Sequence, residues 1–108
     1  MPQLKLRGIN KNNFLNQSKA MLDELEELLK CPRTYFTIEC IDSVFIMDNN
    51  EVTGYPFVEV YWFDRGQEIK DDTAKVITKY IKLSGYENVD VIFFNLSKND
   101  YFENGEHF

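Results

Sequence analysis

The chain has 108 residues with 12 basic and 18 acidic side chains, a net charge of −6, and its length predicts one domain over residues 1–108. Nucleic-acid binding requires concentrated Lys and Arg, which this acidic chain does not supply, and no stretch approaches the roughly 20 apolar residues that span a bilayer. No apolar signal segment follows Met1, and two cysteines with one histidine are too few for a metal cluster. These features predict a cytoplasmic protein without a bound metal, and they exclude nucleic acid and membranes as partners.

The first half of the chain begins with a strand followed by a helix. Residues 3–9 alternate between apolar and polar side chains, as a strand with one buried face does. Asn12 or Asn13 is the expected N-cap of an amphipathic helix that ends before Pro32. The apolar face of this helix recurs at steps of three and four residues, at Phe14, Ser18, Met21, Leu25 and Leu28, reinforced by Leu15, Leu22 and Leu29.

A second strand and a hairpin come next. Residues 34–41 alternate again and place Phe36, Ile38 and Cys40 on one side. The apolar run at residues 44–47 leads into the turn-forming sequence Asp48-Asn49-Asn50. This combination predicts a hairpin-like extension of the chain.

The second half repeats the order of the first. Residues 57–63 are β-branched and aromatic and predict a strand, and Asp64-Arg65-Gly66-Gln67 is similar to a capping box at the start of a helix. The predicted helical face consists of Ile69, Thr73, Val76, Ile77, Tyr80 and Ser84. Gly85 suits the position after that helix, residues 89–96 form an apolar last strand, and Asn104-Gly105 predicts a turn in the tail.

Residues 1–54 and 55–108 read as two copies of one unit. Pro2-Gln3-Leu4-Lys5-Leu6 and Pro56-Phe57-Val58-Glu59-Val60 share the pattern proline, any residue, apolar, charged, apolar. Because a β-α-β crossover makes its two strands parallel, the two units predict an α/β (α+β) fold with a mixed four-stranded sheet and both helices on one face. The other sheet face is predicted to be apolar and uncovered, which favours association. Lys5 and Glu59 are expected to form an ion pair across neighbouring strands.

Three segments carry a resemblance to a known family. The first is the opening Met1-Pro2, which runs directly into a strand. The second is Tyr55-Pro56-Phe57-Val58-Glu59-Val60-Tyr61-Trp62-Phe63-Asp64-Arg65-Gly66, and the third is the ending Tyr101-Phe102-Glu103-Asn104-Gly105-Glu106-His107-Phe108. The chain resembles the tautomerase superfamily, which includes 4-oxalocrotonate tautomerase and macrophage migration inhibitory factor, and within it an uncharacterised bacterial group of domains of unknown function. The resemblance implies a homotrimer with inward-facing sheets, in which neighbouring subunits supply part of each pocket. It also implies that the opening strand lies antiparallel beside the strand from Pro56, with residues 62–65 near Pro2.

Pro2 is the candidate general base that the resemblance implies. A free N-terminal proline is a secondary amine, and burial and a nearby cation lower the pKa of an α-amino group from its ordinary range of roughly 7.7–8.0. Such a base can take a proton from a carbon next to a carbonyl and return it elsewhere, which is keto–enol tautomerisation. The nitrogen is an amine only once Met1 has been removed, which a small following residue such as proline normally permits. While Met1 is present, that nitrogen is an amide and Pro2 is purely structural.

Five further residues are candidates for binding the substrate. Arg65 could clamp a carboxylate or a developing enolate, and the alternative for it is a surface ion pair. Lys30 and Arg33 could act as auxiliary cations, although the end of a helix attracts cations for electrostatic reasons alone. Trp62 and Phe63 could form the wall of an apolar pocket, and aromatic residues in a strand are more often part of the core.

Two functional hypotheses follow. The first is a homotrimeric tautomerase or isomerase that acts on a small carbonyl or carboxylate compound without a metal or organic cofactor. The alternative is a non-catalytic homotrimeric scaffold that binds a small anion or a protein. A fold does not determine a function, so the choice depends on the site.

Overall fold

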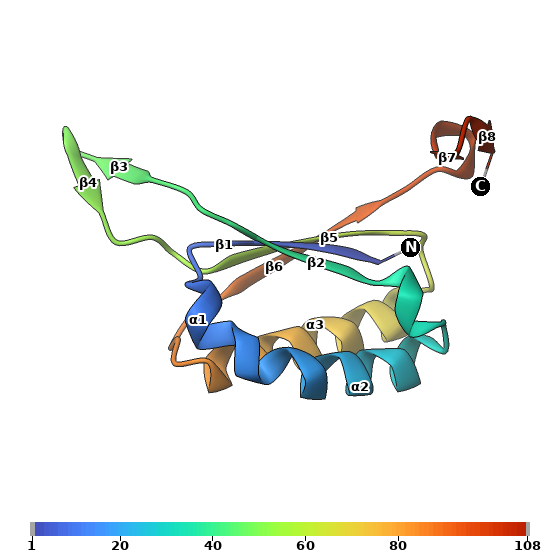
Figure 1. Cartoon of the computed structure of the whole chain (residues 1–108), viewed down its shortest axis with the longest axis horizontal. Coiled ribbons are helices and arrows are strands. Elements are labelled where there is room, and N and C mark those ends of the chain that lie inside the picture. Colours follow the sequence, from blue (N-terminus) through green and yellow to red (C-terminus); the bar gives the residue numbers. More distant parts are fainter. Residues whose placement is uncertain (1, 108) are drawn as a thin grey trace.

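The computed structural model describes residues 2–107, which form a four-stranded sheet covered on one face by helices (Figure 1). The sheet has the order β2-β1-β5-β6, with β1 spanning Gln3–Arg7, β2 Thr37–Ile41, β5 Phe57–Trp62 and β6 Asp90–Asn95. The strands β1 and β2 are parallel, as are β5 and β6, and the central pair β1 and β5 is antiparallel. The first helical segment comprises α1 (Lys11–Phe14), the 3-10 turn η1 (Leu15–Gln17) and α2 (Ser18–Leu29), and the second is α3 (Gln67–Leu83). The predicted mixed sheet with two helices on one face is confirmed.

The core lies between the sheet and the helices. Alternation along the central strands turns Leu4 and Leu6 of β1 and Val58 and Val60 of β5 toward the helices, where they are fully or almost fully buried. The helices contribute the buried side chains of Met21, Leu25, Leu29, Ile77 and Ile81. Each large apolar side chain enclosed in this way stabilises the fold by about 1.5–3 kcal/mol relative to its exposure.

The first helical segment differs from its prediction at both the start and the middle. Its N-cap is Asn10, not Asn12 or Asn13, because the Asn10 side chain accepts a hydrogen bond from the Asn12 backbone N–H (2.8 Å). The η1 turn interrupts the α-helix, and its tighter winding rotates Leu15 away from the predicted apolar face, so that Leu15 is 60% exposed. The helix ends at Leu29, and Lys30 follows in a left-handed conformation (φ 51°).

The start of α3 also differs from its prediction. Gly66 is the N-cap residue, with φ 93° and no side-chain cap. The Asp64 carboxylate accepts a hydrogen bond from the Gly66 backbone N–H (3.0 Å), and the Gln67 side chain donates forward to Asp71 (2.7 Å) instead of back to the cap. The capping-box prediction was therefore wrong, because Asp64 closes a local turn before the helix begins. The end of α3 follows the prediction, since Gly85 lies beyond the C-cap with φ 104°.

Two short 3-10 turns and two hairpins complete the chain. They are η2 (Arg33–Tyr35), the hairpin of β3 (Phe45–Met47) and β4 (Asn50–Val52), η3 (Lys98–Asp100), and the hairpin of β7 (Phe102–Glu103) and β8 (Glu106–His107). Both predicted turns are present, with positive φ at Asp48 and Asn49 in the first hairpin and at Asn104 and Gly105 in the second. The β3–β4 hairpin, residues 45–52, projects from one end of the sheet and is called the hairpin arm below (Figure 1).

The uncovered sheet face is charged as well as apolar, which corrects the prediction of an apolar face. Lys5 and Glu59 lie opposite each other in the register, as predicted, but the ion pair joins Glu59 to Arg7 Nη2 (2.7 Å). The Tyr61 hydroxyl donates to the other Glu59 oxygen (3.1 Å), and the Lys5 ammonium lies 4.9 Å above the Tyr61 ring centre. The Tyr61 ring in turn stacks on Phe94 at 4.7 Å. The longer reach of Arg7 along the same face decides which cation Glu59 binds.

None of the helices in residues 2–107 combines the length and the apolar character that crossing a membrane would need.

Gly8 joins β1 to α1, and we expect its replacement to be costly. Its φ is +70°, and a Cβ at this position would lie 2.2 Å from the Tyr55 carbonyl oxygen. Gly8→Ala should lower the free energy of unfolding by about 2–5 kcal/mol, the sum of left-handed backbone strain and overpacking. Gly85→Ala is the matched control, since Gly85 has φ +104° and no heavy atom within 4 Å of an added Cβ. That control should lose only about 1–2 kcal/mol. Equal losses in urea unfolding would show that the close contact at Gly8 is absent.

Glu24 links α2 to α3 and makes stability depend on pH. Its carboxylate pairs with Lys79 and accepts a hydrogen bond from the Tyr80 hydroxyl (2.7 Å). The hydrogen bond from Lys79, followed by that from Tyr80, lowers the pKa of Glu24 below its ordinary value. A lowered folded-state pKa contributes stability above the ordinary pKa, and this contribution is lost as the pH falls through the folded value.

We therefore expect Glu24→Gln to melt at a lower temperature than the wild type at neutral pH and at the same temperature in acid, where Glu24 is protonated. Glu27→Gln is the control on the same helix, because Glu27 makes no ion pair within residues 2–107. A difference in melting temperature between wild type and Glu24→Gln that is the same at both pH values would contradict the assignment of this pH dependence to Glu24.

Candidate functional site

Pro2 lies at the end of the sheet where β1 begins and β5 finishes. Gln3 is paired with Tyr61 in the antiparallel register, so Pro2 lies beside Trp62. The Pro2 carbonyl accepts a hydrogen bond from the Thr37 backbone N–H (3.2 Å), which ties the start of β1 to β2. The Pro2 side chain is less than 2% exposed. The ring is therefore enclosed by the sheet and the layer beneath it.

Arg65 follows β5 at the same end of the sheet. Its guanidinium carbon lies 5.7 Å from the centre of the Trp62 ring, and its Nη1 donates to the Phe63 carbonyl (3.2 Å). No carboxylate of residues 2–107 forms an ion pair with it. Burial raises the pKa of the Cys31 thiol, and the Arg65 guanidinium opposes this effect, so the cation also acts on the connection after α2. A half-buried guanidinium without an acidic partner retains donors for a carboxylate.

The two other predicted cations have different environments. Arg33 Nη1 pairs with Asp23 (2.8 Å) and Glu26 (3.1 Å) on α2, and the hydrogen bond to Asp23 is the main reason that the pKa of Arg33 is raised. Its charge is thus already neutralised on the surface of the helix. Lys30 is exposed at the end of α2, immediately before Cys31, and forms no ion pair within the described residues.

The two predicted aromatic residues point to neighbours that the sequence did not single out. Trp62 is fully buried, and its indole N–H donates to the Asn95 side chain (3.0 Å). Phe63 is half-buried and meets the Tyr101 ring edge-on, with ring centres 5.5 Å apart. The Tyr101 hydroxyl also accepts a hydrogen bond from the Gln3 side chain (3.4 Å).

Sequence reasoning therefore missed Asn95, Tyr101 and Cys31 as members of this end of the sheet. Asn95 could have been found as the polar residue that closes an otherwise apolar strand parallel to β5. Tyr101 begins the tail segment that carried the resemblance, but nothing in the sequence shows that its partners are Gln3 and Phe63. The structure brings Pro2, Trp62, Phe63 and Arg65 together and leaves Arg33 in a helix surface network.

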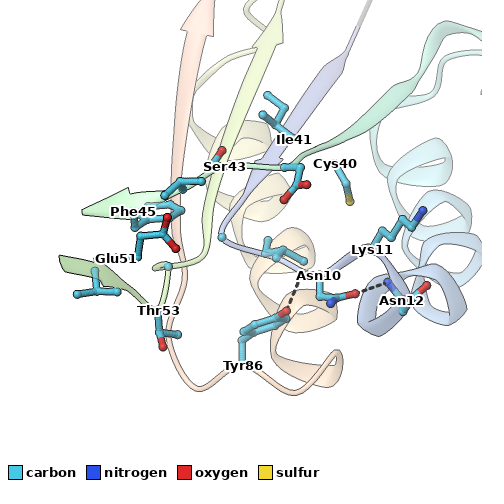
Figure 2. Close-up of a pocket in the computed structure, with 16 residues that line it drawn as sticks. Asn10, Lys11, Asn12, Cys40, Ile41, Ser43, Phe45, Glu51, Thr53 and Tyr86 are labelled. Atoms are coloured by element: carbon cyan, nitrogen blue, oxygen red, sulfur yellow. Dashed lines mark hydrogen bonds between the residues drawn. The ribbon is translucent and has the colours of Figure 1, made fainter. Parts of the chain in front are cut away.

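A cavity lies at the opposite end of β1, away from Pro2. It measures about 750 Å³ and is formed by residues 8–12, by residues 40–45 and 51–54 at the base of the hairpin arm, and by Tyr86 (Figure 2). A second, more open groove of about 450 Å³ runs between α2 and α3. None of the six predicted site residues lines either space. We place the candidate catalytic site at Pro2 on its chemistry, and the cavity is a separate feature of the fold.

No three His, Cys, Asp or Glu side chains within residues 2–107 gather closely enough to hold a metal ion. Besides the Pro2 nitrogen, the polar groups at this end include the Arg65 guanidinium and the Cys31 thiol, which the Lys30 ammonium precedes in the chain.

Solved structures of two bacterial proteins resemble this chain in both sequence and fold. A protein with a domain of unknown function (DUF1904) from Sebaldella termitidis is 35% identical with a TM-score of 0.91, and the match covers 100% of both chains. A protein of unknown function from Vibrio cholerae is 33% identical with a TM-score of 0.86, over 99% of this chain and 87% of that one. No curated protein matches the sequence.

A more distant structure has the same fold. The macrophage migration inhibitory factor-like protein from Entamoeba histolytica is 15% identical with a TM-score of 0.74, over 99% of this chain and 98% of that one. At this identity the match shows the fold alone, and it agrees with the resemblance to the tautomerase superfamily. The family model described as a domain of unknown function (DUF1904) matches residues 1–107. The chain therefore belongs to the DUF1904 family, whose members share the fold of macrophage migration inhibitory factor.

Proposed function

We propose that this protein is a cofactor-independent tautomerase or isomerase of small carbonyl acids, with Pro2 as the general base after removal of Met1. The observation that supports the proposal is the pairing of β1 with β5, which sets the buried Pro2 beside Trp62. The Arg65 guanidinium lies over the same Trp62 ring and has no acidic partner within residues 2–107. We further propose that residues 1–108 act as one domain built from the two repeats.

The proposed reaction moves one proton and needs no oxidant. The enclosed ring and the Arg65 cation both disfavour the charged form of a Pro2 amine, so its pKa would lie below that of an ordinary α-amino group. The neutral amine takes a proton from the carbon next to the substrate carbonyl, and the electron pair moves onto the carbonyl oxygen as an enolate. Arg65 stabilises that negative charge or binds the substrate carboxylate. The Pro2 ammonium then returns the proton to a different carbon.

The substrate class follows from the cations and aromatic rings at this end. Arg65 would bind one carboxylate of the substrate, and Lys30 would add a second positive charge. Trp62 and Phe63 would pack against the apolar part of the substrate. Arg33, by contrast, would have to leave Asp23 and Glu26 to reach a substrate. The structure of Pt0534 inactivated by 2-oxo-3-pentynoate shares this fold at 11% identity, and this supports a small 2-oxo acid as the ligand class.

A labelling experiment tests the base. We expect the intact mass of untagged protein to lack one methionine. Incubation with 2-oxo-3-pentynoate should then add the mass of one whole reagent, since addition of the amine to the triple bond forms an N–C bond and moves the amine proton to carbon. Peptide mapping should place the adduct at Pro2 and leave Cys31 unmodified. An adduct confined to a cysteine would reject Pro2 as the reactive group.

Turnover gives the matching functional test. The ketonisation of the enol of a small 2-oxo acid should slow by about 10²–10⁴-fold in Pro2→Ala, the usual contribution of a general acid–base group. Arg65→Gln should raise KM and lower kcat, whereas Arg33→Gln should leave both unchanged because Arg33 is engaged on α2. Equal rates in wild type and Pro2→Ala would exclude proline catalysis.

One observation favours the alternative of a non-catalytic binding scaffold. The Pro2 ring is buried, and while Met1 remains attached the nitrogen is an amide with no basicity. Under this alternative, Arg65 and Lys30 bind a small anion that is not converted. Retention of the full methionine mass in untagged protein would select the scaffold, whereas loss of that mass would leave the choice to the turnover test of Pro2→Ala.

We also propose that the protein forms the homotrimer that the resemblance implies. The uncovered sheet face carries half-exposed Ile92 and Phe94, and the hairpin arm presents Ile46 and Met47 at 72% and 63% exposure, with Val44 just before it at 67%. An isolated two-stranded hairpin is marginal in water, so docking of the arm on another copy supplies its missing partner.

Light scattering tests this assembly at micromolar concentration. Wild type should have the mass of three chains, and Ile46→Lys should have a lower mass because a charge is placed in the interface. Leu83→Lys is the control, since Leu83 is 59% exposed at the end of α3 in the helical layer, and it should remain trimeric. A monomeric wild type would contradict the assembly.

A further inference from the structure

The cavity beneath the hairpin arm has the size and the fixed walls of a small-molecule site. Its volume of about 750 Å³ lies within the range of known ligand pockets, which is roughly 300–1,000 Å³. Figure 2 shows Lys11 and Asn12 on the side of the first helical segment, with Glu51 and Thr53 on the side of the hairpin arm. The walls thus come from segments that are about forty residues apart in the sequence, and the cavity lies at the opposite end of β1 from Pro2.

Hydrogen bonds hold the floor of this cavity in place. The Tyr86 hydroxyl accepts one bond from the Asn10 backbone N–H (2.7 Å) and one from the Asn13 side chain (3.1 Å). With both bonds accepted, the Tyr86 hydroxyl keeps its own proton for a further acceptor. The Asn10 side chain is fixed in turn by the Asn12 backbone N–H. A floor held in this way pays little conformational entropy when a ligand binds.

Glycines set the opposite wall. A Cβ at Gly54 would lie 2.7 Å from the Phe45 ring and 3.2 Å from the Gly8 Cα, so the base of the arm packs directly on the end of β1. Only glycine at both positions allows the two backbones to approach this closely. The base of the arm is therefore anchored at the cavity by close packing of Gly54 on Gly8 and Phe45.

Charges of both signs line the cavity without neutralising each other. Lys11, Asp42 and Glu51 all contribute to the lining, and none of them takes part in the ion pairs found within residues 2–107. Burial raises the pKa of the Cys40 thiol and the Lys11 ammonium opposes this effect, which shows that the charge of Lys11 acts on the cavity wall. Between the charges lie the apolar side chains of Ile41, Val44 and Phe45.

We propose that this cavity binds a small zwitterion with an apolar side chain, such as an amino acid. Its carboxylate would pair with Lys11, its ammonium with Asp42 and Glu51, and its side chain would pack on Ile41 and Phe45. A simple amine would not engage Lys11, and a simple anion would face two carboxylates, so a ligand that carries both charges makes the most of this lining. The site is independent of chemistry at Pro2.

Binding is tested by amide shifts of the whole protein during titration with three probes. L-leucine carries both charges, L-leucinamide lacks the carboxylate, and N-acetyl-L-leucine lacks the ammonium. L-leucine should give saturable shifts of the Gly8, Asn10 and Gly54 amides at millimolar concentration. The affinity for L-leucine should fall about tenfold in Lys11→Gln and in Glu51→Gln, as expected for loss of one charge-assisted contact.

The variants also separate the two charges. Lys11→Gln should bind L-leucinamide as well as the wild type does, and Glu51→Gln should bind N-acetyl-L-leucine as well as the wild type does. Lys75→Gln, in the groove between α2 and α3, is the control and should bind L-leucine unchanged. Absence of saturable shifts in the cavity amides would overturn the proposal, and so would equal binding of L-leucine and L-leucinamide by the wild type.

Discussion

The antiparallel pairing of β1 with β5 is the constraint on which the rest of the molecule depends. Each β-α-β unit makes only a parallel pair, β1 with β2 and β5 with β6, and these two pairs become one sheet through the central ladder. In its register Leu4 faces Val60 and Leu6 faces Val58, all four turned toward the helices. A shift of one residue would move the whole apolar set to the uncovered face. The same register sets Pro2 beside Trp62, so folding and the candidate site share one determinant.

The uncovered face shows why burial alone is a poor guide to assembly here. A purely apolar face would associate with any apolar surface, whereas this one has an Arg7–Glu59 pair at its centre and a Tyr61–Phe94 stack beside it. The Arg7 Nε–H is buried and has no acceptor within the described residues. A buried donor without a partner is unfavourable, so a second copy that supplies an acceptor would be preferred over one that only covers the surface. The charged centre therefore gives the proposed association its specificity.

The elements could be predicted from the sequence because periodicity and turn chemistry are local signals. Alternation located β1 and β2, and β-branched, aromatic and apolar runs located β5 and β6. Asp48-Asn49 and Asn104-Gly105 located the turns of the two hairpins, and Gly85 located the end of α3. The structure differs from the predictions where two residues could fill the same local role. Asn10 and Asn12 can each cap a helix, and the choice depends on Tyr86, which binds the Asn10 backbone from 76 residues away.

The site was harder to predict than the fold, since its members depend on which side chain reaches which partner. Arg33 and Arg65 look alike in sequence, each near the end of an element, yet Asp23 and Glu26 neutralise Arg33 alone. That difference depends on the winding of α2, which turns two acidic residues toward the segment after it. Tyr101 reaches Gln3 across 98 residues of sequence, and only the finished sheet brings them together. A motif identifies candidate residues, and the contacts made in the folded structure decide which of their charges are neutralised by ion pairs.

Burial of Pro2 has two opposed consequences for proline chemistry. Enclosure of the ring disfavours an ammonium and so lowers the pKa of a free amine toward neutrality, which a general base requires. The same enclosure limits the access of a substrate to the ring. Removal of Met1 would create the base, because it converts the amide nitrogen of Pro2 into an amine. Arg65 is half-buried beside Trp62 and has no acidic partner in residues 2–107. In the proposed reaction it would be the cation that stabilises the enolate formed when Pro2 removes the proton.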